Sequence, residues 1–512
     1  MIVIRTCRLF SPLLLLFLVV PAEGWTAPDT PAGEPPSVEA VIEMVNQYCG
    51  SCHGVPPPNL MPKRSWPKVI QAMADLSAER TGKVFIPQHA VRDITAYYYG
   101  SSPEELPLLP YAEIANGTMG FSATGISDRS PLPMVIDINT VDLGEHYGTG
   151  LLVCDAESNQ VRLIQRAGDS WRETVLAELP VPIRTDVVDF DGDGDKDIVV
   201  AALGILPPSD ELAGKVMLLR QDDDGGFDEA LLLEDIGRTT DARAMDVDND
   251  DDLDLVVAVF GGGTVGGILW LERTESGEYV RHDVLAVSGA LNATPVDLDA
   301  DGRMDFVSLV AQEYESVVAF MNRGQGNFEQ VLLGRAPHPM YGFTGMSLAD
   351  LDGDGDIDIL MSNGDALDTQ PDPKPYHGVQ WLENRGKLHF QFHDIGRFYG
   401  AAVAAAGDMD GDGDLDVVAG SWLNFWDDPR RQSLVLFEND GNKGFTRRGI
   451  LSRPTGIVAL ALEDVTGDDR IDVVAGVLRL DLMMKMTGGD TPQGSETRLL
   501  LLESTAVPQA AP

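Results

Sequence analysis

The stretch Asp189-Phe-Asp-Gly-Asp-Gly-Asp-Lys-Asp-Ile-Val-Val200 joins a nine-residue acidic loop to a β-branched run. The same pattern starts again five times, at Asp246, Asp297, Asp350, Asp408 and Asp464. Successive copies begin 57, 51, 53, 58 and 56 residues apart. A near-constant period of this length is the signature of a repeat architecture. The sequence therefore predicts one structural unit for each copy.

Each loop places polar side chains at its first, third, fifth and ninth positions, and these can converge on a hard cation such as Ca²⁺. The seventh residue can add its backbone carbonyl, and glycine at the sixth permits the sharp turn. An EF-hand begins in the same way but requires Glu at position twelve, where Val200 stands. We therefore predict four to six structural Ca²⁺ ions, against the alternative of tight acidic turns that bind nothing. The candidate ligands are Asp189, Asp191, Asp193, Asp195 and Asp197; Asp246, Asp248, Asp250, Asp252 and Asp254; Asp297, Asp299, Asp301, Arg303 and Asp305; Asp350, Asp352, Asp354, Asp356 and Asp358; Asp408, Asp410, Asp412, Asp414 and Asp416; and Asp464, Thr466, Asp468, Arg470 and Asp472.

Two of the loops depart from the pattern. The second has Asp251 where glycine is preferred, and the last has Thr466 at the third position and Asp469 at the sixth. Both are expected to bind calcium more weakly.

Short β-type runs surround every loop, and four short strands in about 50 residues correspond to one blade of a β-propeller. An earlier copy begins at Val135, and its expected loop, Asp137-Ile-Asn-Thr-Val-Asp142, lacks the metal spacing. The sequence thus predicts an all-β propeller of seven blades over residues 113–507, the first blade without calcium. The last copy lacks an outer strand. Because an open sheet edge invites mispairing, residues 113–127 are expected to supply it.

Charge and the first residues indicate the compartment. The net charge of −44, from 81 acidic and 37 basic residues, argues against nucleic-acid binding. Arg5 and Arg8, the apolar run 9–20 and small residues around 22–27 are typical of a signal peptide, expected at 1–24. A flexible leader is expected at 25–36. No later run of 18 apolar residues occurs, so we predict an exported protein, periplasmic or extracellular, with no membrane span in its mature form.

A small helical unit is predicted at residues 37–105. Ser37 can cap a helix that runs to Tyr48 and delivers Cys49-Gly-Ser-Cys52-His53. Cys-x-x-Cys-His is the attachment motif of a c-type haem: the two thiols add to the porphyrin vinyl groups, and His53 becomes the proximal iron ligand. A thioredoxin-like redox pair is the competing interpretation, but its βαβ setting is missing around Cys49.

The distal haem ligand is less defined. Trp66 opens a second helix that carries Met73, the preferred distal ligand, while Met61 and His89 compete for the position and an open site remains an alternative. A third helix is expected at 87–99 and a Pro-rich linker at 106–112. Cys154, in an apolar run, is expected to be a buried core thiol.

With these residues quoted, the repeats resemble β-propellers of the FG-GAP or VCBS type, and residues 49–53 with the helix at Trp66 resemble small c-type cytochrome domains. The two together resemble exported bacterial fusions of a cytochrome c domain to such repeats. The resemblance implies calcium and electron transfer, with a redox partner protein, but no fixed substrate.

Insertions between strands, at 364–377, 421–428 and 478–496, are candidate surfaces for a small molecule or a carbohydrate. No catalytic constellation stands out, so an electron carrier is the leading expectation. A haem-coupled oxidoreductase and a calcium-dependent adhesive propeller are the alternatives.

Overall fold

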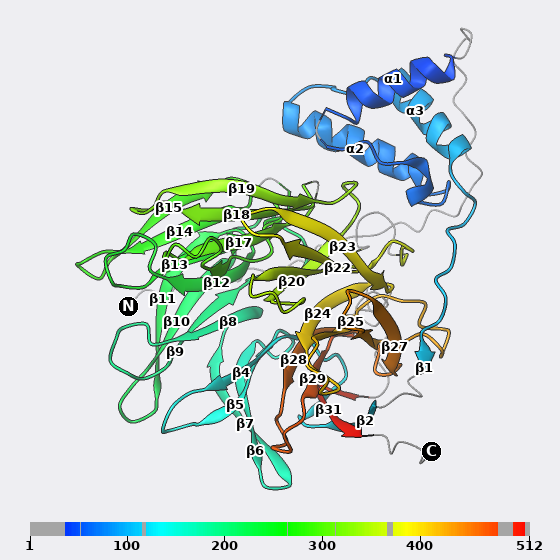
Figure 1. The fold of residues 1–512 in the computed structure, drawn as a ribbon. Helices are drawn as coiled ribbons and strands as arrows, with labels where there is room; N and C mark the ends of the chain where they lie inside the picture. The colour runs from blue at the N-terminus through cyan, green and yellow to red at the C-terminus, as the bar shows by residue number, and fades with distance from the viewer. Residues whose placement is uncertain are drawn as a thin grey trace, which may run out of the picture.

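The computed structural model describes residues 36–51, 53–114, 119–263, 265–312, 314–365, 372–479 and 495–506. It consists of a three-helix unit followed by a seven-bladed β-propeller (Figure 1). The expected signal peptide, Cys52 and most of the insertion at 478–496 lie outside the described residues. None of the described helices is both long and apolar enough to cross a membrane.

The three predicted helices are present in the N-terminal unit. They are α1 (Val38–Tyr48), α2 (Trp66–Thr81) and α3 (Gln88–Ser101), with a short 3₁₀ turn η1 (Pro58–Leu60) before α2. Ser37 caps α1 as expected, because its Oγ accepts the Ala40 N–H at 3.2 Å. Trp66 and Tyr98 pack at the centre with ring centroids 4.1 Å apart, so the apolar faces of the helices form one small core.

Seven blades of four strands follow, and the seven-blade prediction is confirmed. In each blade the antiparallel strands lie side by side in one sheet. Blades 1 to 6 are β4 (Val135–Asp142), β5 (Thr149–Asp155), β6 (Gln160–Ala167), β7 (Ser170–Glu178); β8 (Pro182–Val188), β9 (Asp197–Ala202), β10 (Gly214–Gln221), β11 (Phe227–Ile236); β12 (Thr239–Met245), β13 (Asp254–Val259), β14 (Gly267–Arg273), β15 (Tyr279–Leu285); β16 (Thr294–Val296), β17 (Asp305–Val310), β18 (Ser316–Asn322), β19 (Phe328–Arg335); β20 (Phe343–Ala349), β21 (Asp358–Asn363), β22 (Gly378–Asn384), β23 (Phe390–Arg397); and β24 (Ala401–Gly407), β25 (Asp416–Ser421), β26 (Leu434–Asn439), β27 (Phe445–Leu451).

The second strand of each blade explains the β-branched runs of the sequence. Every residue of β9, β13 and β17 is buried, because these strands are paired on both sides within a blade that is covered by its neighbours. Continuous apolar runs such as Ile198–Ala202 suit that double burial. Cys154, on β5, is fully buried as predicted, and burial raises the pKa of its thiol.

The ring is closed by a strand from before the first blade, as predicted. Blade 7 consists of β28 (Ile457–Glu463), β29 (Asp472–Val477), β31 (Leu499–Ala506) and β2 (Met119–Gly125). The antiparallel register runs from Met119 opposite Ala506 to Gly125 opposite Leu500. A further short strand, β1 (Glu113–Ile114), pairs in parallel with β27 of blade 6. Two shorter strands, β3 (Arg129–Ser130) and β30 (Glu496–Thr497), pair beside this closure.

The prediction of a loop at residues 137–142 in blade 1 is wrong. Residues 137–142 belong to the innermost strand β4, and the connection to β5 is 143–148. Asp137 is only 4% exposed and accepts the backbone N–H of Thr185 at 3.0 Å and the Nδ2–H of Asn139 at 2.8 Å. This carboxylate joins blades 1 and 2, and blade 1 contributes no candidate metal cluster among the described residues.

The propeller has two distinct faces. Because the strands of a blade alternate in direction, the acidic loops and the turns between third and fourth strands lie together on one side, the loop face. The insertions between second and third strands and the connections between blades lie on the other side, the insertion face. The helical unit sits on the insertion face: Arg80 Nη2 donates to the carbonyl of Gly263 at 3.1 Å, and Arg64 Nη2 lies 3.5 Å from Asp372 Oδ2 (Figure 1).

The segment 103–112, called the strap below, connects the helical unit to β1 and lies against blade 6. The Leu109 N–H donates to Tyr399 Oη at 2.7 Å, and Arg431 Nη1 donates to the Leu109 carbonyl at 3.0 Å. Tyr111 Oη donates to Asp428 Oδ2 at 2.6 Å, under the guanidinium group of Arg430. The expected linker at 106–112 is therefore an attached part of the propeller surface.

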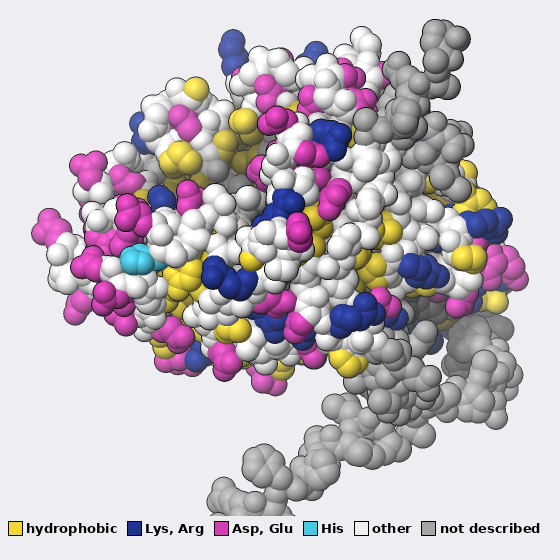
Figure 2. Space-filling view, turned by 90° about the horizontal axis from the view of Figure 1, so that it is seen from below, with side chains coloured by type: hydrophobic (Ala, Val, Ile, Leu, Met, Phe, Trp, Pro, Cys, Tyr) yellow, Lys and Arg dark blue, Asp and Glu magenta, His cyan; other side chains and the backbone are white. Residues whose placement is uncertain are grey.

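The surface is acidic, as the composition requires. In the view of Figure 2, acidic side chains are densest along the left and lower edges and also lie over the upper part, while Lys and Arg lie mainly across the middle.

Candidate metal centres and haem attachment site

The six acidic loops share one backbone shape. The first aspartate accepts backbone N–H groups from within its own loop; Asp408, for example, accepts from Gly411 at 2.8 Å and from Gly413 at 3.1 Å. The fifth aspartate accepts the N–H of the seventh residue, as Asp412 does from Asp414 at 3.0 Å. These bonds curl the chain so that the odd-numbered side chains converge.

Five of the loops bring three carboxylates together, with one ligand oxygen from each lying within 4.8 Å of the others. Among the described residues the loop at Asp464 forms no such group, because Thr466 replaces the third carboxylate. The five groups are Asp189, Asp191 and Asp197; Asp246, Asp248 and Asp250; Asp297, Asp299 and Asp305; Asp350, Asp352 and Asp358; and Asp408, Asp410 and Asp412.

The ninth aspartate has a role that the sequence did not indicate. This residue is at most 2% exposed in all six loops, and its carboxylate accepts two backbone N–H groups, one from its own loop and one from the third strand of the blade. Asp358, for example, accepts from Leu351 at 2.9 Å and from Asn384, at the end of the third strand, at 2.7 Å. Burial raises the pKa of Asp358 to about 6 and that of Asp416 to about 7. The ninth position therefore braces the loop against the blade, and in the loops at Asp189, Asp297 and Asp350 it also belongs to the carboxylate group.

The third position supplies the observation that favours a cation. Asp191, Asp248 and Asp352 each bury an Oδ1 that has no hydrogen-bond partner in the described structure. A buried oxygen without a partner costs free energy, and a bound cation removes that cost. The oxygen-only donor sets and the curled backbone fit Ca²⁺.

The sixth position adopts the left-handed conformation in every loop. Its φ is 102° at Gly194 and 95° at Gly355. In the two exceptional loops Asp251 has φ 72° and Asp469 has φ 64°. The expectation of a sharp turn that glycine permits is confirmed, and the two aspartates adopt the same turn with the strain that glycine avoids.

Basic side chains pair with several loops, which the repeat pattern did not predict. Arg220 lies 3.1 Å from Asp191, and Arg323 lies 3.2 Å from Asp299. Lys443 reaches from blade 6 to blade 5, where its Nζ lies 2.9 Å from Asp352 Oδ2 and 2.6 Å from Glu383 Oε1. Arg303 and Arg470, expected to offer backbone carbonyls, also pair through their side chains with Asp301 and Asp468.

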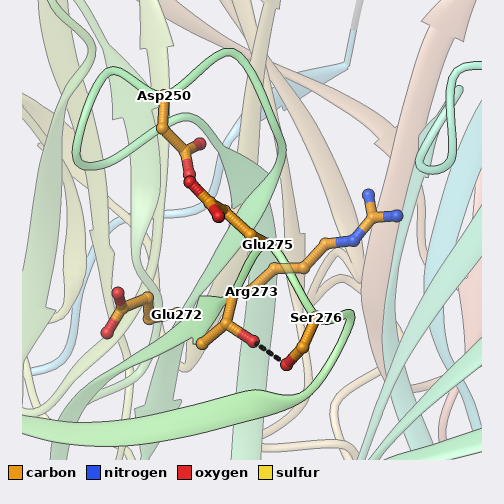
Figure 3. Close-up of a pocket in the computed structure, with 6 residues that line it drawn as sticks. Asp250, Glu272, Arg273, Glu275 and Ser276 are labelled. Carbon is orange, nitrogen blue, oxygen red and sulfur yellow. Dashed lines mark hydrogen bonds between the residues drawn. The ribbon is translucent and has the colours of Figure 1, made fainter.

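A polar hollow of about 640 Å³ lies beside the second acidic loop (Figure 3). Asp250 and Glu275 point toward each other in Figure 3. Glu272, on its wall, lies 2.6 Å from His282 Nε2. The hollow extends the acidic surface of the loop and shows no nucleophile with an adjacent base. Its lining residues are Asp250, Glu272, Arg273, Thr274, Glu275 and Ser276.

In the helical unit, His53 follows directly after α1 and its turn. Its Nδ1 lies 2.9 Å from the carbonyl oxygen of Gly54. Because a carbonyl only accepts, Nδ1 carries the proton and Nε2 is left as the basic nitrogen, the arrangement found in metal-binding histidines. Cys49 is partly buried at the end of α1. The His53 imidazole and the Cys49 thiol are thus the two described donors of this motif, and Cys52 lies outside the described residues.

The three candidate distal ligands occupy different environments. Met73 lies on α2 and is 40% exposed, whereas Met61 is 2% exposed inside the helical core. His89 is exposed on the first turn of α3. Val38 and Val84 of the same unit are also largely exposed. Of the three candidate ligands, Met61 belongs to the helical core, and Met73 and His89 lie at its surface.

The fold and the acidic loops together define a β-propeller built from acidic-loop repeats. Residues 189–257 and 297–361 match the FG-GAP-like repeat family, so the chain carries FG-GAP-like repeats on a seven-bladed propeller. No curated protein matches the chain.

Proposed function

We propose that the chain is an exported c-type haem protein that carries single electrons, with its calcium-stabilised propeller as the docking platform. The observation that supports this most is the Cys49-x-x-Cys52-His53 motif at the end of α1, where the Nδ1 contact of His53 leaves Nε2 available. The haem supplies one-electron redox chemistry when bound. The chain's own residues attach it, ligate its iron and limit its exposure to water.

The assignment of Met73 as the distal ligand belongs to the same proposal. Its partial exposure on α2 leaves the thioether accessible to a cofactor, while Met61 already fills the helical core. His53 and Met73 would hold the iron, and this imidazole and thioether pair would raise the reduction potential, which favours electron carriage over catalysis.

Export and calcium complete the proposal. Residues 1–24 act as a signal peptide that sends the chain to the periplasm or beyond, where covalent haem attachment takes place. Four to six Ca²⁺ ions occupy the acidic loops, and the weakest sites are those at Asp246 and Asp464. The acidic surface (Figure 2) suits a redox partner protein with a basic docking face, because opposite charges steer the two together.

The test is a reduced-minus-oxidised absorption spectrum of the full chain, produced in a host that attaches haem c. We expect a c-type α band, and a methionine-to-iron band that Met73→Ala removes and Met61→Ala retains. Absence of covalent haem from the wild-type chain would overturn the proposal. Loss of the methionine band in Met61→Ala alone would overturn only the choice of Met73.

A second function is favoured by the propeller itself. A propeller with FG-GAP-like repeats is a binding platform, and its insertion face can hold a small substrate whose electrons pass to the haem. Haem reduction by a panel of sugars, alcohols and sulfur compounds tests this oxidoreductase function. A flat response to the whole panel counts against it and leaves the carrier proposal in place.

A further inference from the structure

The insertion face carries a cluster of aromatic and thioether side chains that joins the packing between blades 4 and 5 to the core of the helical unit. It consists of His338, Met340, Tyr341 and Tyr376, and we call it the blade 5 aromatic cluster. The first three lie on the connection between blades 4 and 5, and Tyr376 lies in the insertion between β21 and β22. The ring of His338 lies 4.8 Å from that of Tyr376 and 5.5 Å from that of Tyr341.

The cluster faces the end of the helical unit that bears the haem motif. Met340 and Tyr376 pack against the core of the helical unit, as does Cys49. Gly54, which follows His53, is close enough to the connection that a Cβ placed on it would lie 4.0 Å from the carbonyl oxygen of Pro337. The backbone that follows His53 therefore lies beside the connection between blades 4 and 5.

His338 is the unusual member of the cluster. It is 6% exposed, and its Nδ1 has no hydrogen-bond partner in the described structure. Burial lowers the pKa of this imidazole to about 4, so it is neutral at physiological pH. A buried polar nitrogen without a partner costs free energy, which a bound group with a polar rim would recover.

We propose that the blade 5 aromatic cluster is the propeller-side wall of the haem site. The inference rests on the proposed function, because it assumes a haem attached at Cys49 and Cys52. Aromatic edges and a thioether match the apolar plane of a porphyrin, and a neutral imidazole offers a hydrogen bond to its polar rim. The haem site is then shared by both parts of the chain, and an electron donor or acceptor reaches it from the insertion face of blades 4 and 5.

The test is the midpoint potential of the full, haem-loaded chain. We expect Tyr376→Ala and His338→Ala to lower the potential, because water admitted to the haem stabilises the more charged ferric form. The equilibrium constant for reduction should fall about tenfold, which is about 59 mV for one electron. Tyr376→Phe keeps the ring and should retain the wild-type potential. His389→Ala and Phe392→Ala, exposed positions elsewhere on blade 5, are the matched controls and should change nothing.

The outcomes separate this inference from the function on which it rests. A c-type spectrum with unchanged potential in both alanine variants overturns the shared haem site and leaves the carrier proposal intact. Absence of covalent haem in the wild-type chain overturns the carrier proposal.

If the cluster variants fail to fold, amide hydrogen exchange tests whether the cluster lines the haem site. This experiment needs no substitution in the cluster. The haem-loaded chain is compared with a Cys49→Ala and Cys52→Ala double variant, which cannot hold the haem covalently. We expect segments 336–342 and 372–376 to exchange faster without haem, while the turn 323–327 on the loop face is unchanged. Equal exchange in the two forms overturns the inference.

Discussion

At the scale of single residues, the sixth position of the acidic loops shows how the repeat tolerates variation. Four copies use glycine there, and two use Asp251 and Asp469 in the same left-handed conformation. Aspartate enters this region more readily than most residues, but at a cost that glycine does not have. The loop thus keeps its backbone shape when aspartate replaces glycine, and the backbone of that aspartate is strained.

Asp469→Gly should stabilise the chain. We expect the free energy of unfolding to rise by about 0.5–1 kcal/mol when φ at this position no longer strains a side chain. Denaturant unfolding in the presence of a chelator measures the backbone effect apart from calcium. The reciprocal change Gly413→Asp, in a regular loop, should lower stability by a similar amount. If both substitutions shift stability in the same direction, backbone strain is not the cause.

Glu383 should give the chain a pH-dependent contribution to stability. Burial opposes its ionisation, but hydrogen bonds from Lys443, Arg385 and His393 outweigh burial and lower its pKa to about 2. A depressed carboxyl pKa stabilises the folded state above the unfolded pKa near 4.5, and the stabilisation is lost as pH falls through 2. Glu383→Gln should therefore cost about 2 kcal/mol at pH 7, and progressively less below pH 4.5.

Urea unfolding of the wild type and the variant at several pH values between 7 and 3 measures this difference. Glu329→Gln removes an exposed partner of Arg323 and is the control, expected to change stability by less than about 1 kcal/mol at any pH. A Glu383→Gln cost that is independent of pH would show that the ion pairs around Glu383 are not its source.

At the scale of elements, the closing strand β2 stands out for the long stretch of sequence that separates it from the strand with which it pairs. It pairs with β31 along its full length, from Met119 to Gly125, and covers an edge that would otherwise be exposed. Open edges of this kind template mispairing with other chains. The strand therefore protects solubility as well as stability.

A chain that begins at residue 127 should be less stable than one that begins at residue 113. Only the longer chain keeps β1 and β2, so its thermal midpoint should lie near that of the complete propeller. The shorter chain should lose about 3–5 kcal/mol, since several backbone hydrogen bonds of about 1 kcal/mol each disappear. It should also aggregate at lower concentration. Scanning calorimetry and light scattering measure both effects, and equal midpoints for the two chains would refute a closing role for β2.

At the scale of the whole molecule, bound calcium should govern stability. Each site that binds Ca²⁺ only in the folded state adds about 2.7 kcal/mol at a free concentration 100 times its dissociation constant. We expect a chelator to lower the thermal midpoint by more than about 10 °C, because several blades lose an ion together, and added Ca²⁺ to restore it. Mg²⁺ at equal concentration should restore little, since it demands a tighter octahedral shell. If the chelator leaves the thermal midpoint unchanged, the acidic loops fold without a cation.

Local pattern was enough to predict the seven blades, the three helices, the closing strand and the turn at each sixth loop position. It failed where a residue's partner lies far along the chain. Asp137 was predicted to lie in a loop because its hydrogen-bond partner Thr185 belongs to the next blade, and the local sequence does not indicate that contact. Lys443 belongs to a different repeat from Asp352 and Glu383. Arg80 contacts Gly263 across 183 positions, so no local pattern places the helical unit on the insertion face.

The closure of blade 7 also sets the order in which the molecule can be completed during synthesis. The strand β2 ends at Gly125, but its partner β31 ends at Ala506. An emerging chain must therefore keep β2 unpaired with its final neighbour while six blades are made and folded. A product that stops before β31 retains an open ring however well its other blades fold. Such a product exposes an unpaired strand edge, which makes it prone to aggregate.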